Sequence, residues 1–365
     1  MPKKTALYER HTALGGRMVD FAGWLLPVQY AAGPKAEHLC VRQKAGLFDI
    51  DHMGQLLVSG PDALPFLQAT MTADVSAIPL YGAAYSLLCY EDGGVVDDTF
   101  IYRLPDRFFV AINASNNRKD TLWLQYHRAG YDVRLENVSE SMYMLALQGP
   151  LSEQILQPLC ESDLSAMAYH TALEARVAGV PTLLGRTGYT GEDGFELYFP
   201  TEQATDVWDA LMVRGEPLGL LPIGLAARDS LRFECCMPLY GQELSPTITP
   251  LEAGLRWAVA FDKPSFLGRK ALLKQQLEGV TRRLVGFRMV EGGVPRHGYA
   301  IAVNDQPCGE VTSGMYAPTL DAFLGMGYVP TAHAEVGVEI EVLIRDKPRK
   351  AVIVRRPFYA PKYRK

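Results

Sequence analysis

Two adjacent aspartates, Asp97 and Asp98, follow a pair of glycines in the segment 93–104. The residues after this glycine pair are rich in β-branched and aromatic side chains, which predicts a strand. Because side chains alternate between the faces of a strand, Asp97 lies with Thr99 among polar neighbours. Asp98 falls on an otherwise apolar and aromatic face, which carries Val96, Phe100, Tyr102 and Leu104.

A carboxylate on an apolar face is unstable unless a partner satisfies its charge or it takes up a proton. Asp98 is therefore either part of a binding pocket, where a ligand supplies that partner, or a structural residue that caps a turn or pairs with an arginine. The strand alone leaves both interpretations open.

A second carboxylate, Glu196, lies in a strand expected over 195–199, after the turn signal Asp193-Gly194. Alternation directs Phe195, Leu197 and Phe199 toward the core and Glu196 toward the opposite face. A glycosidase uses two carboxylates, but nothing in the flanking sequence distinguishes Asp98 and Glu196 from a chance pair.

Familiar cofactor and nucleophile motifs are missing from the sequence. The glycines at 188, 191 and 194 have the spacing GxxGxxG, which is not the dinucleotide fingerprint. There is no GxxxxGK[ST] phosphate loop and no GxSxG elbow. The seven histidines are scattered without an HxH or HExxH pattern, so no metal site is expected.

Two further segments carry charged groups of interest. In a helix expected to open after Gly224, Arg228 and Arg232 are four residues apart and share a face. For this pair a solvated, salt-bridged helix side is the preferred interpretation, and a functional role is the alternative. His52, just ahead of the strand expected over 55–58, is interpreted as structural.

Composition limits the classes of protein to which the chain can belong. Its 365 residues predict two or three domains, and a hydrophobic content of 48% with 21% charged residues is typical of a soluble globular protein. A net charge of -5 argues against nucleic-acid binding. No apolar run is long enough to span a membrane.

The cellular location is expected to be cytoplasmic. The start of the sequence resembles neither a signal peptide nor a transit peptide. The six cysteines show no CxxC spacing, and reduced, mostly buried thiols are expected.

Several elements must position the candidate residues. The turn Pro105-Asp106 joins the Asp98 strand to a strand expected over 107–113, and helices are expected over 120–127 and 201–212, the latter with Thr201 as its N-cap. After about residue 280, short strands separated by turns predict a small antiparallel barrel or sandwich, preceded by a linker near 270–282.

The order of eight motifs closely resembles the glycine cleavage T-protein family of tetrahydrofolate-dependent aminomethyltransferases. These motifs cover the chain from about residue 5 to residue 358: residues 18–24, 46–54, 93–98, 148–150, 186–197, 227–232, 239–243 and 312–314. The resemblance implies an α+β fold with a three-domain, cloverleaf-like arrangement around a central folate cavity and a C-terminal antiparallel β-barrel. The implied domains are 1–275, with a lobe at 47–137 possible as an insertion, and 280–365.

The resemblance also implies a reaction. The enzyme takes an aminomethyl group from the lipoyl arm of a separate carrier protein, releases ammonia and passes the one-carbon unit to tetrahydrofolate. Asp98 is then the catalytic acid, which polarises the folate's bridging nitrogen and stabilises a developing iminium. Glu196 accepts hydrogen bonds from the pterin. The other implied folate-binding residues are Tyr189, Arg228, Tyr102, Tyr85, Asn113 and Met53, and no metal or redox cofactor is needed.

Some residues depart from the family pattern and keep an alternative open. Asp51 replaces a usual serine, Gly33-Pro34-Lys35 replaces a more hydrophobic stretch, and the segment 235–238 replaces a small-residue turn. The runner-up function is a folate-dependent demethylase of the same superfamily that acts on a small methylated compound. A folate-binding module without catalysis is a third alternative, but its Lys-Gly-Cys-Tyr motif is absent.

The carboxyl-terminal end is basic although the whole chain is acidic. Its charges are concentrated in the run 345–350 and continue in Arg355, Arg356, Lys362, Arg364 and Lys365. This run is interpreted either as a solvated barrel edge that discourages aggregation or as a surface that attracts an acidic carrier or the glutamate tail of folate.

Overall fold

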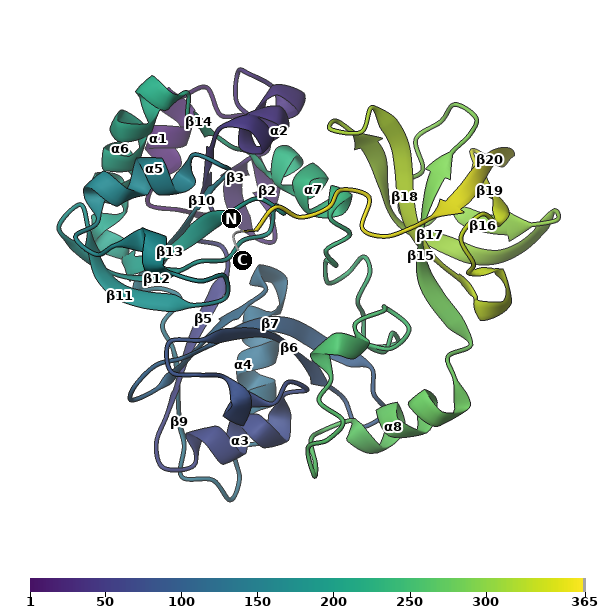
Figure 1. The fold of residues 1–365 in the computed structure, drawn as a ribbon, viewed down its shortest axis with the longest axis horizontal. Coiled ribbons are helices and arrows are strands. Elements are labelled where there is room, and N and C mark those ends of the chain that lie inside the picture. Colours follow the sequence, from purple (N-terminus) through teal and green to yellow (C-terminus); the bar gives the residue numbers. More distant parts are fainter. Residues whose placement is uncertain (364–365) are drawn as a thin grey trace.

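The computed structural model describes residues 1–363 as helices and strands grouped in three β-sheet bodies around a common centre (Figure 1). The first body is a six-stranded sheet of order β11-β12-β13-β10-β4-β14. Its strands are β4 (Gly46–Asp49), β10 (Met142–Gln148), β11 (Ala172–Val177), β12 (Val180–Gly185), β13 (Gly194–Pro200) and β14 (Leu221–Pro222). A small sheet lies near the amino terminus and consists of β1 (Lys3–Lys4), β3 (Trp24–Pro27) and β2 (Met18–Phe21).

Helix α6 (Ala204–Gly215) covers one face of the first body because its apolar stripe matches the core face of β13. Val207, Trp208 and Leu211 are buried in one cluster with Phe195 and Leu197, as the alternation in the sequence predicted. The helices of this body are α1 (Tyr8–Ala13), α2 (Pro34–Gln43), α5 (Ser152–Leu156), α6 (Ala204–Gly215) and α7 (Leu225–Glu234). The expected helix 201–212 begins later than predicted: Thr201 opens a 3-10 turn and does not cap α6.

The second body contains the Asp98 strand. It is an antiparallel five-stranded sheet of order β6-β7-β8-β5-β9, built from β5 (Gly54–Ser59), β6 (Ala83–Cys89), β7 (Val95–Arg103), β8 (Phe108–Ile112) and β9 (Arg134–Asn137). Its helices are α3 (Ala63–Thr70) and α4 (Asn117–Tyr126), the second of which confirms the helix expected over 120–127. The chain then returns to the first body through β10, whereas the residue bounds of the implied domains stay a prediction.

The third body is a closed antiparallel barrel of order β15-β18-β17-β16-β19-β20, which confirms the expected C-terminal barrel within an α+β fold. Its strands are β15 (Arg282–Met289), β16 (Ala300–Val303), β17 (Gln306–Ala317), β18 (Ala322–Pro330), β19 (Glu339–Ile344) and β20 (Lys347–Val354). Sequence patterning missed β18, which is glycine-rich. The expected linker near 270–282 precedes the barrel, and the helix α8 (Arg269–Glu278), which was not expected, occupies most of it.

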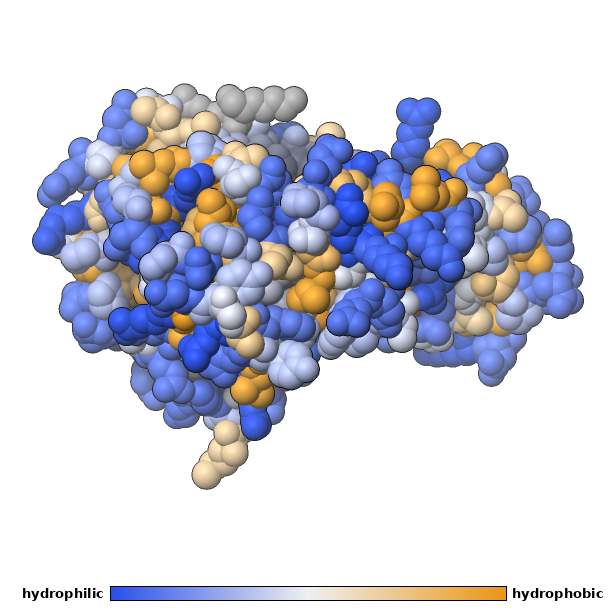
Figure 2. Space-filling view, turned by 90° about the horizontal axis from the view of Figure 1, so that it is seen from below, coloured by the Kyte–Doolittle hydropathy of each residue, from blue (hydrophilic) through white to orange (hydrophobic). Residues whose placement is uncertain are grey.

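Short 3-10 helices complete the description at Val75–Ala77, Ala114–Asn116, Gln157–Leu159, Leu164–Ala166, Thr201–Gln203, Glu216–Leu218, Arg256–Ala258 and Thr331–His333. Among residues 1–363, no helix combines the length and the apolar character needed to cross a membrane. On the face shown in Figure 2, hydrophilic residues predominate and apolar residues occur in small groups.

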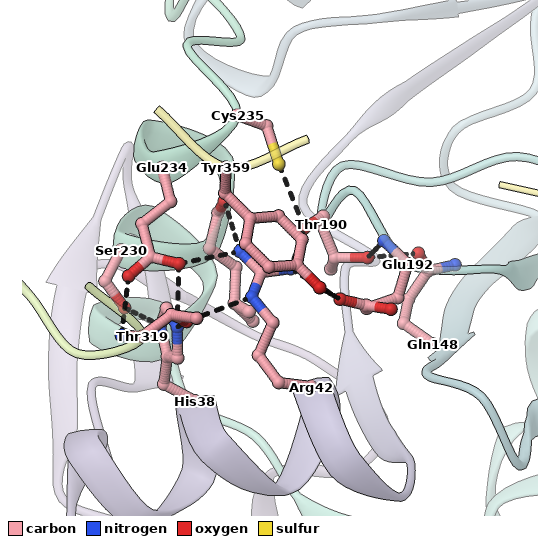
Figure 3. A network of polar contacts seen from close by, with 11 residues as sticks. His38, Arg42, Gln148, Thr190, Glu192, Ser230, Glu234, Cys235, Thr319 and Tyr359 are labelled. Atoms are coloured by element: carbon pink, nitrogen blue, oxygen red, sulfur yellow. Dashed lines mark hydrogen bonds and ion pairs between the residues drawn. The ribbon is translucent and has the colours of Figure 1, made fainter. Parts of the chain in front are cut away.

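A buried polar cluster around Arg42 ties the barrel to the first body (Figure 3). The Arg42 guanidinium, on α2, forms ion pairs with Glu192 at 3.1 Å and with Glu234 at 3.0 Å. The backbone carbonyls of Thr190 and Leu231 and the hydroxyl of Thr319 accept its remaining hydrogen bonds. Every donor of this buried cation is therefore used, and we refer to the group as the Arg42 network.

The Arg42 network also holds the carboxyl-terminal segment, which crosses from the barrel to the first body (Figure 1). The Tyr359 hydroxyl donates to Glu192 at 2.6 Å, and the Tyr359 ring stacks on the Arg42 guanidinium at 3.9 Å. Farther along, Tyr363 stacks on Tyr169 with ring centroids 4.1 Å apart. The predicted basic residues Arg364 and Lys365 lie outside the described residues.

Candidate functional site

Asp98 lies on β7 and is half-buried beneath two polar side chains from neighbouring strands. Tyr85 on β6 donates its hydroxyl to Asp98 Oδ2 at 3.1 Å, and the Asn113 amide, just after β8, donates to Oδ1 at 2.8 Å. Burial and the charge of Asp97 raise the pKa of Asp98 to about 7. A carboxyl with such a pKa changes its protonation near neutral pH, which suits proton transfer or the stabilisation of a developing cation.

The structure brings three of the predicted residues, Asp98, Tyr85 and Asn113, into direct contact, but Asp97 is not the ordinary polar residue expected from alternation. Asp97 is fully buried. Its carboxylate accepts hydrogen bonds from the Asn113 backbone and side chain at 3.2 and 2.9 Å and from Asn116 at 2.7 Å. The turn after β8 folds beneath β7 and supplies these amides, which strand alternation cannot reveal.

Glu196 lies on β13 with one oxygen held and the other free. The Tyr198 hydroxyl donates to Oε2 at 2.9 Å, and that of Tyr102, on β7, donates to the same oxygen at 3.4 Å. Burial raises the pKa of Glu196. Within residues 1–363, no hydrogen bond reaches Oε1, so this oxygen remains able to accept one from a ligand. The contact with Tyr102 also joins the first and second bodies at this point.

Arg228 and Arg232 on α7 have different environments, and neither lies on the solvated helix side that was preferred. Arg232 is buried and forms ion pairs with Glu243 at 2.7 Å and Asp229 at 2.8 Å. The Arg228 guanidinium lies over the Tyr189 ring at 5.0 Å and forms no hydrogen bond or ion pair with the described residues. Burial lowers the pKa of Arg228. Arg228 is therefore the arginine that a ligand can engage.

The turn 50–54 carries Met53 and the unusual Asp51. Met53 is half-buried against a core cluster that contains Tyr102 and Tyr198. His52 is buried beside Phe21, and burial together with the charge of Arg228 lowers its pKa to about 3, which supports the structural interpretation.

Asp51 lines a cavity of about 370 Å³ together with Lys3, Lys4, Ala6, Trp24, Ser139, Glu140 and Thr201. Burial and Asp49 raise the pKa of Asp51 to about 8.

Sequence reasoning missed three residues beside the site: Asn116, Asp120 and Trp257. Asn116 binds Asp97, and Asp120 is a fully buried carboxyl on α4. Trp257 is 67% exposed, yet its ring packs against Tyr85 with centroids 5.3 Å apart. The asparagine-rich stretch 113–117 was the available signal for Asn116, whereas the long-range contact between Trp257 and Tyr85 left none.

A metal centre is not indicated by the side chains of residues 1–363, where no group of three histidine, cysteine, aspartate or glutamate residues could hold an ion. All six cysteines are free thiols. The polar groups that could engage a ligand are instead the free oxygen of Glu196, the guanidinium of Arg228 and the Asp98 carboxyl.

Comparisons with known proteins agree with this geometry. Residues 7–263 match the model of the GCVT N-terminal domain, and residues 282–360 match that of the glycine cleavage T-protein C-terminal barrel domain. The chain is 46% identical to an aminomethyltransferase of Caldanaerobacter subterraneus subsp. tengcongensis, with 100% of this chain and 97% of the relative covered. It is 49% identical to an aminomethyltransferase of Desulforamulus reducens over 98% of both chains.

A solved structure extends the similarity to three dimensions. The glycine cleavage system aminomethyltransferase T of Bartonella henselae superimposes with a TM-score of 0.94 at 34% sequence identity, over 100% of both chains. The family models, the full-length relatives and this shared fold show that the chain belongs to the glycine cleavage T-protein family of aminomethyltransferases.

Proposed function

We propose that Asp98, Glu196 and Arg228 carry the aminomethyltransferase reaction of this chain, with tetrahydrofolate as the acceptor and a lipoyl carrier protein as the source of the aminomethyl group. The observation that carries the proposal is the half-buried Asp98 carboxyl, held by Tyr85 and Asn113 with its pKa raised to about 7. The demethylase alternative is not favoured, since the full-length relatives are aminomethyltransferases.

The polar and aromatic side chains of the site are of the kinds that bind a folate. A pterin edge presents two hydrogen-bond donors, an amino group and a ring N–H. Both carboxylate oxygens of Glu196, the free Oε1 and the Oε2 that the tyrosine hydroxyls bind, can accept a hydrogen bond from this edge. Arg228 and Tyr189 add a cationic group stacked on an aromatic ring. Tyr102 lies on the other side of the proposed contact, bound to Glu196. Met53 contributes apolar surface to the adjoining core cluster. Tetrahydrofolate supplies the nitrogen that accepts the one-carbon unit.

Asp98 performs the charge chemistry in this proposal. The protonated amino group leaves as ammonia with the electron pair of the carbon–nitrogen bond, and positive charge develops on the carbon. Two nitrogens of tetrahydrofolate bond to this carbon, while the carbon–sulfur bond breaks with its electron pair on the lipoyl sulfur. Of the two protons that the nitrogens lose, one goes to the sulfur and one to solvent. An ionised Asp98 stabilises the positive charge on the carbon, and Tyr85 and Asn113 hold both carboxylate oxygens so that little reorganisation is needed.

The remaining parts of the proposal concern the carrier and the location. The basic run 345–350 comprises the two-residue turn between β19 and β20 and the first four residues of β20, all exposed. Since the barrel is closed, this run does not protect an edge strand, and we propose that it attracts an acidic carrier over long range. A cytoplasmic location is supported by the six free thiols, which are typical of a reducing compartment.

The direct test supplies the purified protein with aminomethylated lipoyl carrier and tetrahydrofolate. We expect ammonia and methylenetetrahydrofolate to form in equal amounts. Ammonia release that does not require tetrahydrofolate, or formation of methylenetetrahydrofolate from a small methylated compound instead of the carrier, would contradict the proposal. The protein without tetrahydrofolate and the carrier without its aminomethyl group serve as controls.

A further inference from the structure

A further carboxyl, Asp120, is fully buried near the Asp97–Asp98 pair and has no role in the mechanism described above. It lies in the first turn of α4 with 0% of its surface exposed. Neither of its oxygens accepts a hydrogen bond from any donor among residues 1–363. A buried carboxylate without donors is strongly unfavourable, so Asp120 is expected to be a neutral acid that donates a hydrogen bond.

The acceptor that faces Asp120 is Asp97. Asp120 lies one helical turn after Asn116, the N-cap of α4 whose amide donates to Asp97, and this spacing places it on the helix side that faces Asp97. Burial together with Asp97 raises the pKa of Asp120 far above its usual range. The nearest cation, the Lys119 ammonium, lies 3.9 Å from Asp120 Oδ1, but it donates to the Val96 carbonyl and lies over the Tyr240 ring. Lys119 therefore does not replace the missing donor.

The distribution of donors decides which carboxyl of the pair holds the proton. Asp97 accepts three N–H bonds, from the backbone and side chain of Asn113 and from Asn116, and these favour its ionised form. Asp120 accepts none. The pair thus shares one proton, which belongs to Asp120.

Asn113 connects this pair to the reaction centre. Its side-chain amide donates to Asp97 Oδ1 at 2.9 Å and to Asp98 Oδ1 at 2.8 Å. An amide has two hydrogens, so one points to each carboxyl. The orientation of Asp97 therefore determines whether the second hydrogen reaches Asp98.

We propose that Asp120 is a positioning residue for this reaction: as a neutral acid it donates to Asp97, keeps Asp97 ionised and oriented, and through Asn113 holds and tunes Asp98. This inference rests on the proposed role of Asp98 in catalysis, although the state of the Asp120–Asp97 pair can be measured separately. The other titratable groups around the pair are Tyr85, Tyr90, Lys119 and Tyr240, together with Asp98 itself.

Two substitutions separate a neutral donor from a merely structural residue. Asp120→Asn keeps a neutral donor of the same shape, whereas Asp120→Ala removes it. Without the Asp120 hydroxyl, Asp97 loses one of the four donors that favour its ionised form, so it takes up a proton more readily and its negative charge beside Asp98 is reduced. The pKa of Asp98 should then fall, because the charge of Asp97 helps to raise it in the wild type.

The experiment records the carboxyl-carbon NMR titration of the free enzyme, with the Asp98 signal assigned by its loss in Asp98→Asn. We expect Asp120→Asn to titrate like the wild type. Asp120→Ala should shift the Asp98 midpoint to lower pH, in the same direction as the reference variant Asp97→Asn. The pH profile of kcat with saturating donor and tetrahydrofolate should shift by the same amount.

The outcomes distinguish the inference from the proposed function. An unchanged Asp98 midpoint in a folded Asp120→Ala protein, or an equal shift in Asp120→Asn, would overturn the inference. A shifted NMR midpoint with an unchanged pH profile would instead support the inference and contradict the catalytic role of Asp98. If Asp120→Ala does not fold, the inference is tested by comparing Asp120→Asn with Asp97→Asn. The Asp98 midpoint should move to lower pH in Asp97→Asn and stay at the wild-type value in Asp120→Asn, and a shift in Asp120→Asn would overturn the inference.

Discussion

Two groups of buried charges in this protein are built in opposite ways. In the Arg42 network every donor of the cation has a partner, and Glu192 and Glu234 are bound on at least one oxygen by charged or hydroxyl donors (Figure 3). At the candidate site, Arg228 only stacks on an aromatic ring, one oxygen of Glu196 is free, and Asp98 lies beside a second carboxylate.

The difference separates anchoring from function. Removing one member of a satisfied buried ion pair leaves an unpaired charge, so such a pair resists change and fixes the position of the segments it joins. Under-satisfied charges lower the stability of the fold, but they are available to bind and stabilise a ligand. Substitutions in the two groups should therefore affect stability with opposite signs.

The largest expected effect on activity comes from Asp98→Asn. An amide cannot stabilise the developing positive charge, so kcat should fall about 100-fold to 10,000-fold, the range for a positioned acid or base. Wild-type activity should rise with pH through about 7, because the ionised form is required. The measurement is the carrier-dependent formation of methylenetetrahydrofolate as a function of pH.

The same variant should be more stable than the wild type above neutral pH. Because the pKa of Asp98 is raised from 3.8 to about 7 in the folded state, the folded protein binds the extra proton, and its stability falls as pH rises between these values. Asp106→Asn, in the exposed turn after β7, is the matched control and should change neither property. Full activity of Asp98→Asn at pH 8, or a stability below that of the wild type, would contradict the assignment of Asp98 to the group of under-satisfied, functional charges.

In the Arg42 network, Arg42→Ala should mainly destabilise the fold. The variant leaves Glu192 and Glu234 buried without their cation, and the free energy of unfolding should fall by about 3–5 kcal/mol. Urea unfolding followed by tryptophan fluorescence measures this change. The control is Arg10→Ala, which removes an exposed pair with Asp209 and should alter stability little. Loss of tetrahydrofolate affinity in still-folded Arg42→Ala would place Arg42 in the binding site instead.

Glu196→Gln should weaken tetrahydrofolate binding without abolishing it. Gln retains one acceptor oxygen but cannot accept both pterin donors, and a hydrogen bond to a charged group contributes about 1.5–3 kcal/mol. The dissociation constant measured by calorimetry should therefore increase about 10-fold to 100-fold. Glu174→Gln, with its exposed carboxylate on β11, serves as the control. An unchanged dissociation constant would remove Glu196 from the folate site.

The smallest effect is expected from exposed charges, which belong to neither group. The double variant Arg349→Glu with Lys350→Glu should slow carrier-dependent turnover a few-fold at low ionic strength, because long-range attraction acts on association. Turnover with free aminomethyl-lipoamide should not change. Lys270→Glu with Lys274→Glu, on α8, is the control for net charge. Equal losses with both donors would show that the basic run does not attract the carrier.

Alternation along single strands identified much of the candidate site. The period of two selected Asp98 as a carboxylate on an aromatic face and separated Glu196 from its core-facing neighbours, and the order of motifs identified the family. These features depend on local sequence, because the faces of a strand follow from backbone geometry alone. For the same reason the barrel strands were foreseen, whereas β18, in which glycines interrupt the pattern, was not.

Contacts between distant segments were decided only by the tertiary structure. Arg228 and Arg232 are equivalent in the helical pattern, yet Glu243 satisfies Arg232 and nothing in residues 1–363 satisfies Arg228. Likewise, Asp97 reads as an ordinary polar residue until the turn after β8 and helix α4 enclose it with Asn116 and Asp120. Whether a charge is paired depends on which chain segments meet after folding, and periodicity within one segment carries no information about its neighbours.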